Sequence, residues 1–426
     1  MENFIRATAE SLGVVGAQAA VVKGETVRSY AVGLADARHG TPVDDGTLFQ
    51  IGSTTKLYTA AMLMRLADDG RLDIDAPVSG HLPEYDLGTI TARHLMSMTS
   101  GLDNGPYADT GRGDDCVAAY VRLLAGIPPI FEPGAGFGYS NASTVVSGLL
   151  VERITGRCWD DALRDLLLEP AGLAHTAGLA DELLYHRVAL GHTREREVVK
   201  PFFFSRGLGP SGSTLCASAL DLIAFGRLFL RGGVLSAAAL KEMHTPHAEV
   251  PARCFADHWC AGPYLKIWDG VRVYGHSGTT PSGSSTLNWI PEHDLVVATI
   301  VNVAERGYQF ADAVIREIVR AETGVVKPAL PEPDPALSIA PDPYTGRYGA
   351  HDLLYEVTAK DGRLHAVIHG PDGSLASTDL LPLGEHRFLP ADDAFTAHHM
   401  WDVAFVMGAD GRAVRLLNGA FAARSL

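Results

Sequence analysis

The chain has 426 residues, of which 46% are hydrophobic and 20% charged, so it can bury a full core and form two or three domains. Its formal net charge of −15 argues against nucleic acid or an anionic membrane as a partner, because both require a basic face, and leaves a small molecule as the expected substrate. The five cysteines are odd in number and lack CxxC spacing, which argues against a zinc site and a disulfide framework and favours reduced thiols.

The first 325 residues are expected to have strands at both ends and helices between them. The apolar run Leu12–Val22 is read as a first strand rather than a secretory signal, and the turn at 23–25 makes it half of a hairpin. The segment LYTAAMLMRLADDG after Ser53 is apolar on nearly every face and ends in glycine, which is typical of a buried helix. Helical segments are expected from Thr91 to Ile154, interrupted by the loop IPPIFEPGAGFGYSN.

Three further strands and a helix complete this part of the chain. VRVYGHSG, STLNWIP and DLVVATIVN read as strands joined by tight turns, and residues 309–322 read as a helix. The order predicts an α/β domain, in which a mixed antiparallel sheet flanked by helices carries a helical insertion.

A proline-rich segment then divides the chain. Residues 326–343 contain six prolines and are expected to form a stiff linker between a domain at 1–325 and a small domain at 344–426. The last segment alternates apolar and polar residues around Asp361-Gly362, which favours a small antiparallel barrel or sandwich. Every catalytic candidate precedes residue 280, so the last domain is not expected to hold the chemical centre.

The stretch IGSTTKLY places Ser53 three residues before Lys56. If a helix begins at Ser53, the two side chains lie one turn apart on the same face, and the amine reaches the hydroxyl. Free N–H groups and the positive dipole at a helix start stabilise an alkoxide. Burial would lower the pKa of the lysine from about 10.4, which a neutral base requires. The spacing therefore predicts a nucleophile and its base.

Two more stretches carry polar groups on a loop and at a strand end, where they could contact a substrate. The loop FEPGAGFGYSNAS delivers Tyr139, Ser140 and Asn141, a phenol and a carboxamide together. The strand VYGHSG carries His276 to Thr279, and Gly278 would let a substrate backbone approach closely.

Together and in this order, these three stretches resemble the motifs of the serine β-lactamase-like superfamily, which includes class C β-lactamases, D-alanyl-D-alanine carboxypeptidases, D-aminopeptidases, esterases and transacylases. TLFQIGSTTK, HLMSMTSGL and PSGSTLCASALDLIAF extend the resemblance over about residues 10–323. It implies the β-lactamase-like fold for that part, and the last domain resembles the small, lipocalin-like barrel appended to some members.

The resemblance also implies roles. Ser53 would be the acylated nucleophile, Lys56 the base that takes its proton, and Tyr139 the group that passes a proton to the leaving group. Asn141 would hold Lys56 and the acyl amide of the substrate. His276, Ser277, Gly278 and Thr279 would line the substrate site, and the backbone N–H groups of Ser53 and Thr279 would form an oxyanion hole, with each donor contributing about 3 to 4 kcal/mol.

One position departs from the penicillin-directed pattern, where a lysine usually precedes the serine or threonine of the third motif. His276 has an unperturbed pKa near 6.5, so it is expected to be mostly neutral at pH 7 and to donate one hydrogen bond. We therefore expect weak β-lactamase activity and a preference for uncharged esters and amides. The handicap of carboxylate substrates is expected to shrink as the pH falls toward about 6.

The function expected is that of a cytoplasmic serine hydrolase or acyltransferase, with secondary metabolism as one setting. It would form an acyl-enzyme from a small ester or amide and pass the acyl group to water, or to an amine or alcohol acceptor. A β-lactamase, a D-alanyl-D-alanine carboxypeptidase or D-aminopeptidase, and a non-catalytic penicillin-binding-like sensor stay open.

No cofactor, metal or membrane partner is expected, and the oligomeric state is left open. The pair His398-His399 would point to opposite faces of a strand, and no spaced ligand pattern supports a metal site there. No run approaches the ~20 apolar residues that a membrane-spanning helix requires.

Overall fold

The two ends of the first 325 residues meet in one sheet. In the computed structural model, β1 (Gly16–Lys23) pairs antiparallel with β2 (Thr26–Asp36) on one side and with β12 (Leu295–Val301) on the other. The structure describes residues 1–334, 337, 339–384, 386–392 and 402–426. His398-His399 lies outside the described residues.

Over the described residues the sheet has nine strands in the order β3-β2-β1-β12-β11-β10-β9-β8-β7, and its neighbours pair antiparallel. The three strands predicted around VRVYGHSG are β10, β11 and β12. The other bounds are β3 Thr41–Pro42, β7 Ala248–Glu249, β8 His258–Trp259, β9 Tyr264–Trp268, β10 Val271–Thr280 and β11 Gly283–Ile290.

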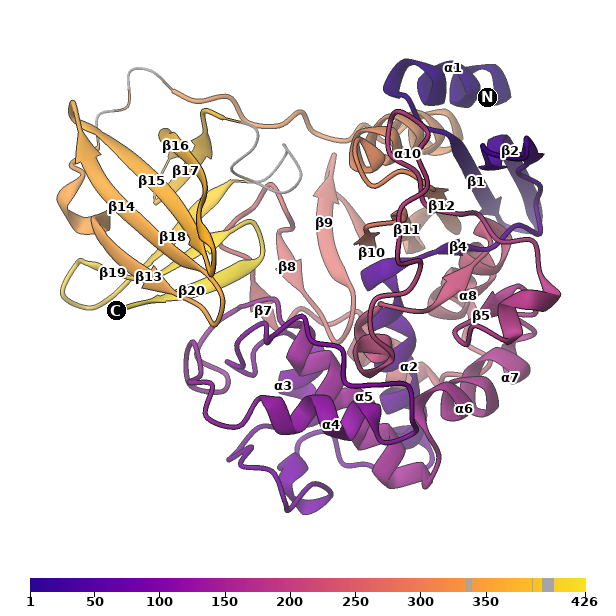
Figure 1. Ribbon diagram of the computed structural model, residues 1–426, viewed down its shortest axis with the longest axis horizontal. Coiled ribbons are helices and arrows are strands. Elements are labelled where there is room, and N and C mark those ends of the chain that lie inside the picture. The colour runs from indigo at the N-terminus through magenta and orange to yellow at the C-terminus, as the bar shows by residue number, and fades with distance from the viewer. Residues whose placement is uncertain (335–336, 338, 385, 393–401) are drawn as a thin grey trace.

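Helices cover both faces of this sheet (Figure 1). On one face, α1 (Glu2–Leu12) and α10 (Gly307–Thr323) bury Ile5 and Phe310. On the other face, α8 (Ala219–Arg231) packs Phe229 flat against Trp289 of β11, with ring centroids 4.4 Å apart. The helical insertion lies beyond α8 and consists of α2 Thr55–Asp68, α3 Ala92–Met96, α4 Cys116–Leu123, α5 Asn141–Thr155, α6 Trp159–Leu163, α7 Glu169–Ala171 and α9 Ala237–Met243. The predicted mixed sheet with helices is confirmed.

Two local expectations need correction. The reading of Leu12 as part of the first strand is wrong, because Leu12 ends α1, Gly13 takes a left-handed conformation with φ 71° and the strand begins at Gly16. Helices also occupy less of the stretch from Thr91 to Ile154 than expected, since α3, α4 and α5 are separated by long loops. Short strands β4 (Phe49–Gln50), β6 (Cys216–Ala217) and β5 (Thr176–Ala177) form a small sheet beside the start of α2.

The segment after the linker forms a closed barrel rather than a sandwich. Among the described residues it has eight strands paired in chain order, and its interior is filled by aromatic residues such as Phe388 and Phe405. The bounds are β13 Gly346–Gly349, β14 Leu354–Lys360, β15 Arg363–Gly370, β16 Gly373–Gly384, β17 Arg387–Pro390, β18 Val403–Met407, β19 Ala413–Asn418 and β20 Phe421–Ser425.

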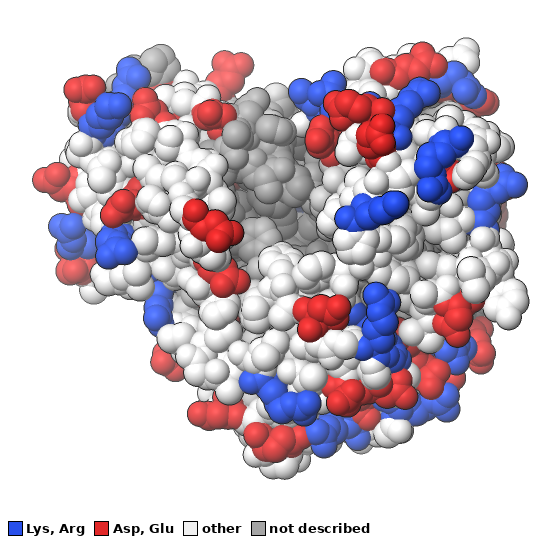
Figure 2. Space-filling view, in the orientation of Figure 1, with Lys and Arg blue, Asp and Glu red and all other residues white. Residues whose placement is uncertain are grey.

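The barrel packs against the sheet body through a shared apolar cluster. Leu417 and Ala420 join Phe137, Tyr139 and Trp259 in it. Figure 2 shows a hollow between the barrel and the body, with acidic and basic side chains interspersed around the rim. Among the described residues, no helix combines the length and hydropathy needed to cross a bilayer.

Candidate active site

Ser53 lies in a single 3-10 turn, Gly52–Thr54, that leads directly into α2. The turn is pressed against β10 because two glycines remove the side chains between them. A Cβ added at Gly52 would lie 2.7 Å from the N of Thr279, and one added at Gly278 would lie 2.6 Å from the N of Ser53. The two N–H groups expected to form the oxyanion hole therefore lie on adjoining backbone segments.

Lys56 is buried, 2% exposed, and its Nζ lies 3.0 Å from Ser53 Oγ. The amine also contacts Asn141 Oδ1 and the carbonyl of Ser211, both at 2.7 Å. A neutral amine has two N–H groups for these two carbonyls and one lone pair for the serine proton. No carboxylate of the described residues pairs with it, and burial lowers its pKa well below the usual range.

Tyr139 stands over this pair. Lys56 Nζ lies 4.9 Å from the centroid of the tyrosine ring, and Tyr139 and Ser53 line the same cleft. Burial raises the pKa of the phenol well above 10, so the group stays protonated and can donate.

Asn141 is the first residue of α5 and is fixed by the loop before α4. Ser140 caps the helix by accepting from Ser143 N, and Asn141 N donates to Asn104 Oδ1 at 3.0 Å. The carboxamide accepts from Lys56, and its Nδ2 donates to the hydroxyl of Tyr107 at 3.1 Å. Tyr107 was not among the sequence candidates, and no local pattern marked it.

His276 sits on β10 in an aromatic surround, with its ring centroid 5.4 Å from Trp259 and 6.1 Å from Tyr139. Nδ1 lies 2.7 Å from the carbonyl oxygen of Ser277, so Nδ1 carries the proton and donates to it. Nε2 is then an acceptor, buried and without a partner among the described residues. The Nε2 lone pair therefore lies buried beside the cleft, with no donor among the described residues.

Two expectations about His276 are consequently wrong. Its N–H is used by the backbone, so the neutral ring has no donor left for a substrate. Burial lowers its pKa to about 3, so the ring does not regain a positive charge near pH 6.

A cleft of about 720 Å³ opens above these groups. Ser53, Tyr139, Asn141, His276, Ser277 and Thr279 all line it, while Gly278 supports it from the backbone. The barrel contributes Ala420 and Phe421 to the same cleft, although every sequence candidate preceded residue 280. Tyr139 N donates to the carbonyl of Ala420 at 2.9 Å. Among the described residues, no group of three or more His, Cys, Asp or Glu side chains could hold a metal ion.

Comparisons with known proteins show the family to which the chain belongs. A family model described as Beta-lactamase matches residues 1–320, and the chain belongs to that family. It is 34% identical to "Penicillin-binding protein 4" of Amycolatopsis lactamdurans over 356 residues, which cover 77% of this chain and 92% of the relative. It is 30% identical to "Esterase EstB" of Burkholderia gladioli over 319 residues, which cover 65% of this chain and 80% of the relative.

A solved structure is similar over the whole length, barrel included. The crystal structure of SurE is 29% identical, covers 100% of this chain and 98% of its own, and superposes with a TM-score of 0.86. The structure of SurE with D-Leu has 28% identity and a TM-score of 0.83. The protein is thus a member of a family of serine hydrolases that includes esterases and penicillin-binding proteins.

Proposed function

We propose that the protein forms an acyl-enzyme at Ser53 from an uncharged ester or amide and then passes the acyl group to water or to an amine or alcohol. The observation that carries this proposal is the contact of Lys56 Nζ with Ser53 Oγ at 3.0 Å, in a site where the amine is buried away from any carboxylate of the described residues. Such an amine is held neutral and can accept the serine proton at neutral pH.

The steps follow from the atoms present. Lys56 takes the proton of Ser53, and Oγ attacks the carbonyl carbon of the substrate. The oxyanion is held by the N–H groups of Ser53 and Thr279. When the C–N or C–O bond breaks, Tyr139 donates its proton to the leaving group and recovers one from the lysine ammonium. Water or an acceptor then enters by the reverse route, which regenerates the serine.

The cleft favours uncharged groups next to the scissile bond. His276 lines it as a neutral imidazole, and Phe255 and Phe421 provide apolar surface. A carboxylate at this position would meet a lone pair instead of a cation. Because SurE is known with D-Leu and matches this chain along its length, we propose acyl groups derived from D-amino acids. We also propose that the protein is located in the cytoplasm.

A panel of aryl esters and amides of D- and L-amino acids, with and without added amines, tests the proposal. We expect a common deacylation rate for esters that share an acyl group, and a product ratio that shifts toward the new amide as amine is added. Equal turnover of D- and L-amino acid substrates would contradict the proposal that the acyl group derives from a D-amino acid. A fluorescent penicillin included in the panel tests the penicillin-binding alternative, which the 34% identical relative supports.

A further inference from the structure

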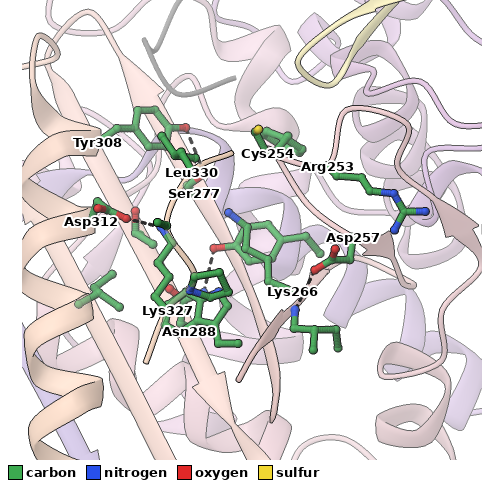
Figure 3. A pocket seen from close by; sticks show the side chains of 18 of the residues that line it. Arg253, Cys254, Asp257, Lys266, Ser277, Asn288, Tyr308, Asp312, Lys327 and Leu330 are labelled. Carbon is green, nitrogen blue, oxygen red and sulfur yellow. Dashed lines mark hydrogen bonds and ion pairs between the residues drawn. The ribbon is translucent and has the colours of Figure 1, made fainter. Parts of the chain in front are cut away.

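A second cavity lies on the opposite face of β10 from His276. It has a volume of about 270 Å³, is open on one side, and is lined by strands β9 to β11, helix α10, residues 253–257, linker residues 327–331 and Arg387 of the barrel (Figure 3). Phe255, Ser277 and Tyr308 line both this cavity and the reaction cleft. The hydroxyl of Tyr308 donates to Ser277 Oγ at 3.1 Å, so the partition between the two spaces is hydrogen-bonded.

Lys266 lines this cavity from β9. Its Nζ lies 4.9 Å from the centroid of the Tyr264 ring, and no hydrogen bond or ion pair joins it to any described residue. The other three cations of the cavity have counter-ions, because Lys327 pairs with Asp312, Arg387 with Asp402 and Arg253 with Glu249. Lys266 is half-buried, and an amine that lines a cavity without a partner among the described residues can serve as the counter-ion of an anionic ligand.

The surroundings limit the chemistry of that ligand. The walls include Ile315 and Leu330, which suit a short alkyl group. Asp257 and Asp312 also line the cavity and would repel a dianion such as phosphate. A carboxylate carries a single negative charge, accepts from an ammonium and can carry an apolar tail. Burial lowers the pKa of Lys266 to about 7, and an anion beside the amine would favour its charged form.

We propose that this cavity is a binding site for a short-chain monocarboxylate, with Lys266 as the counter-ion. The carboxylate is either free in solution or attached to a substrate or acceptor that passes the Ser277–Tyr308 partition. Binding of the carboxylate at this site takes no part in bond making or breaking, and its test does not require Ser53 to be the nucleophile.

Butyrate and the neutral isostere butyramide are the probes. Their dissociation constants would be measured by ligand-observed NMR on the wild-type protein and on Lys266→Met, Lys266→Arg and Ser53→Ala variants. Lys241→Met, which changes an exposed lysine of α9, is the matched control, and circular dichroism checks the fold of each variant. We expect butyrate to bind at least tenfold more tightly than butyramide. Lys266→Met should remove that preference, while Lys266→Arg, Ser53→Ala and Lys241→Met retain most of it.

Kinetics separates the two sources of the carboxylate. If the group belongs to a substrate, Lys266→Met lowers kcat/KM for esters with a tethered distal carboxylate at least tenfold relative to their amide isosteres. If the ligand is free, that ratio is unchanged and only butyrate binding is lost. Equal binding of butyrate by Lys266→Met and the wild type, or equal binding of butyrate and butyramide, would overturn the proposal.

Discussion

The ring of Tyr139 packs edge-on against the ring of Phe421, with the two centroids 5.4 Å apart and the planes at 79°. One residue lies at the start of the α5 region and the other on the last strand of the barrel. The barrel therefore forms part of the wall that positions the phenol over Ser53.

Replacing Phe421 by alanine is expected to lower kcat/KM roughly tenfold, because it removes one side of the contact that orients Tyr139. Circular dichroism should show an intact fold, since the barrel core does not depend on this ring. Leu375→Ala, an exposed change on β16, is the matched control. Equal activity of the two variants would mean that the barrel has no part in catalysis.

Lys56 and Tyr139 are expected to act as one proton-transfer unit. Lys56→Met and Tyr139→Phe should each reduce kcat by about 10² to 10⁴, and the double variant should lose little more than the worse single one. Single-turnover rates on one ester and one amide provide the measurement. Losses that multiply in the double variant would show that the two groups act independently.

The buried, neutral state of His276 leads to a prediction about pH. Because its pKa is about 3, the preference for uncharged substrates over their carboxylated counterparts should stay constant between about pH 5.5 and 8. The rate itself should fall on acidification as Lys56 takes up a proton. His276→Lys should raise the relative reactivity of the carboxylated member tenfold or more, since a charge-assisted hydrogen bond contributes about 1.5 to 3 kcal/mol. His276→Gln, which keeps an acceptor, is the control. A carboxylate preference that grows toward pH 5.5 in the wild type would contradict this account.

His244 predicts a loss of stability in acid. Its Nε2 accepts from the Trp289 indole N–H at 2.8 Å, and burial lowers its pKa to about 4. The unfolded chain takes up this proton near pH 6.5 while the folded chain does not, so the stability it confers is complete above about pH 6.5 and declines as the pH falls toward 4. The loss at pH 4.5 is expected to be about 2 to 3 kcal/mol. Urea unfolding from pH 7 to 4.5 should show a smaller decline in the free energy of unfolding for His244→Gln than for the wild type. An identical decline in the two proteins would show that His244 is not the cause.

Local patterns were enough to predict that Ser53 and Lys56 are in contact. Ser53 lies in the 3-10 turn that leads into α2 and Lys56 in the first turn of α2, and the burial of this apolar helix lowers the pKa of the amine. The hydrogen-bonding state of His276 could not be predicted in this way, because it depends on Trp259 and Tyr139, which come from other elements. The barrel residues at the cleft were missed for the same reason, since docking of β19 and β20 is a long-range contact without a local signal.

The most direct measurement is intact mass after incubation with a slowly deacylating ester or a phosphonate. The account predicts one adduct per chain, located at Ser53 by peptide mapping, absent in Ser53→Ala and formed at least 100-fold more slowly in Lys56→Met. An adduct that persists in a folded Ser53→Ala variant, or that maps to another residue, would contradict the assignment of Ser53 as the nucleophile.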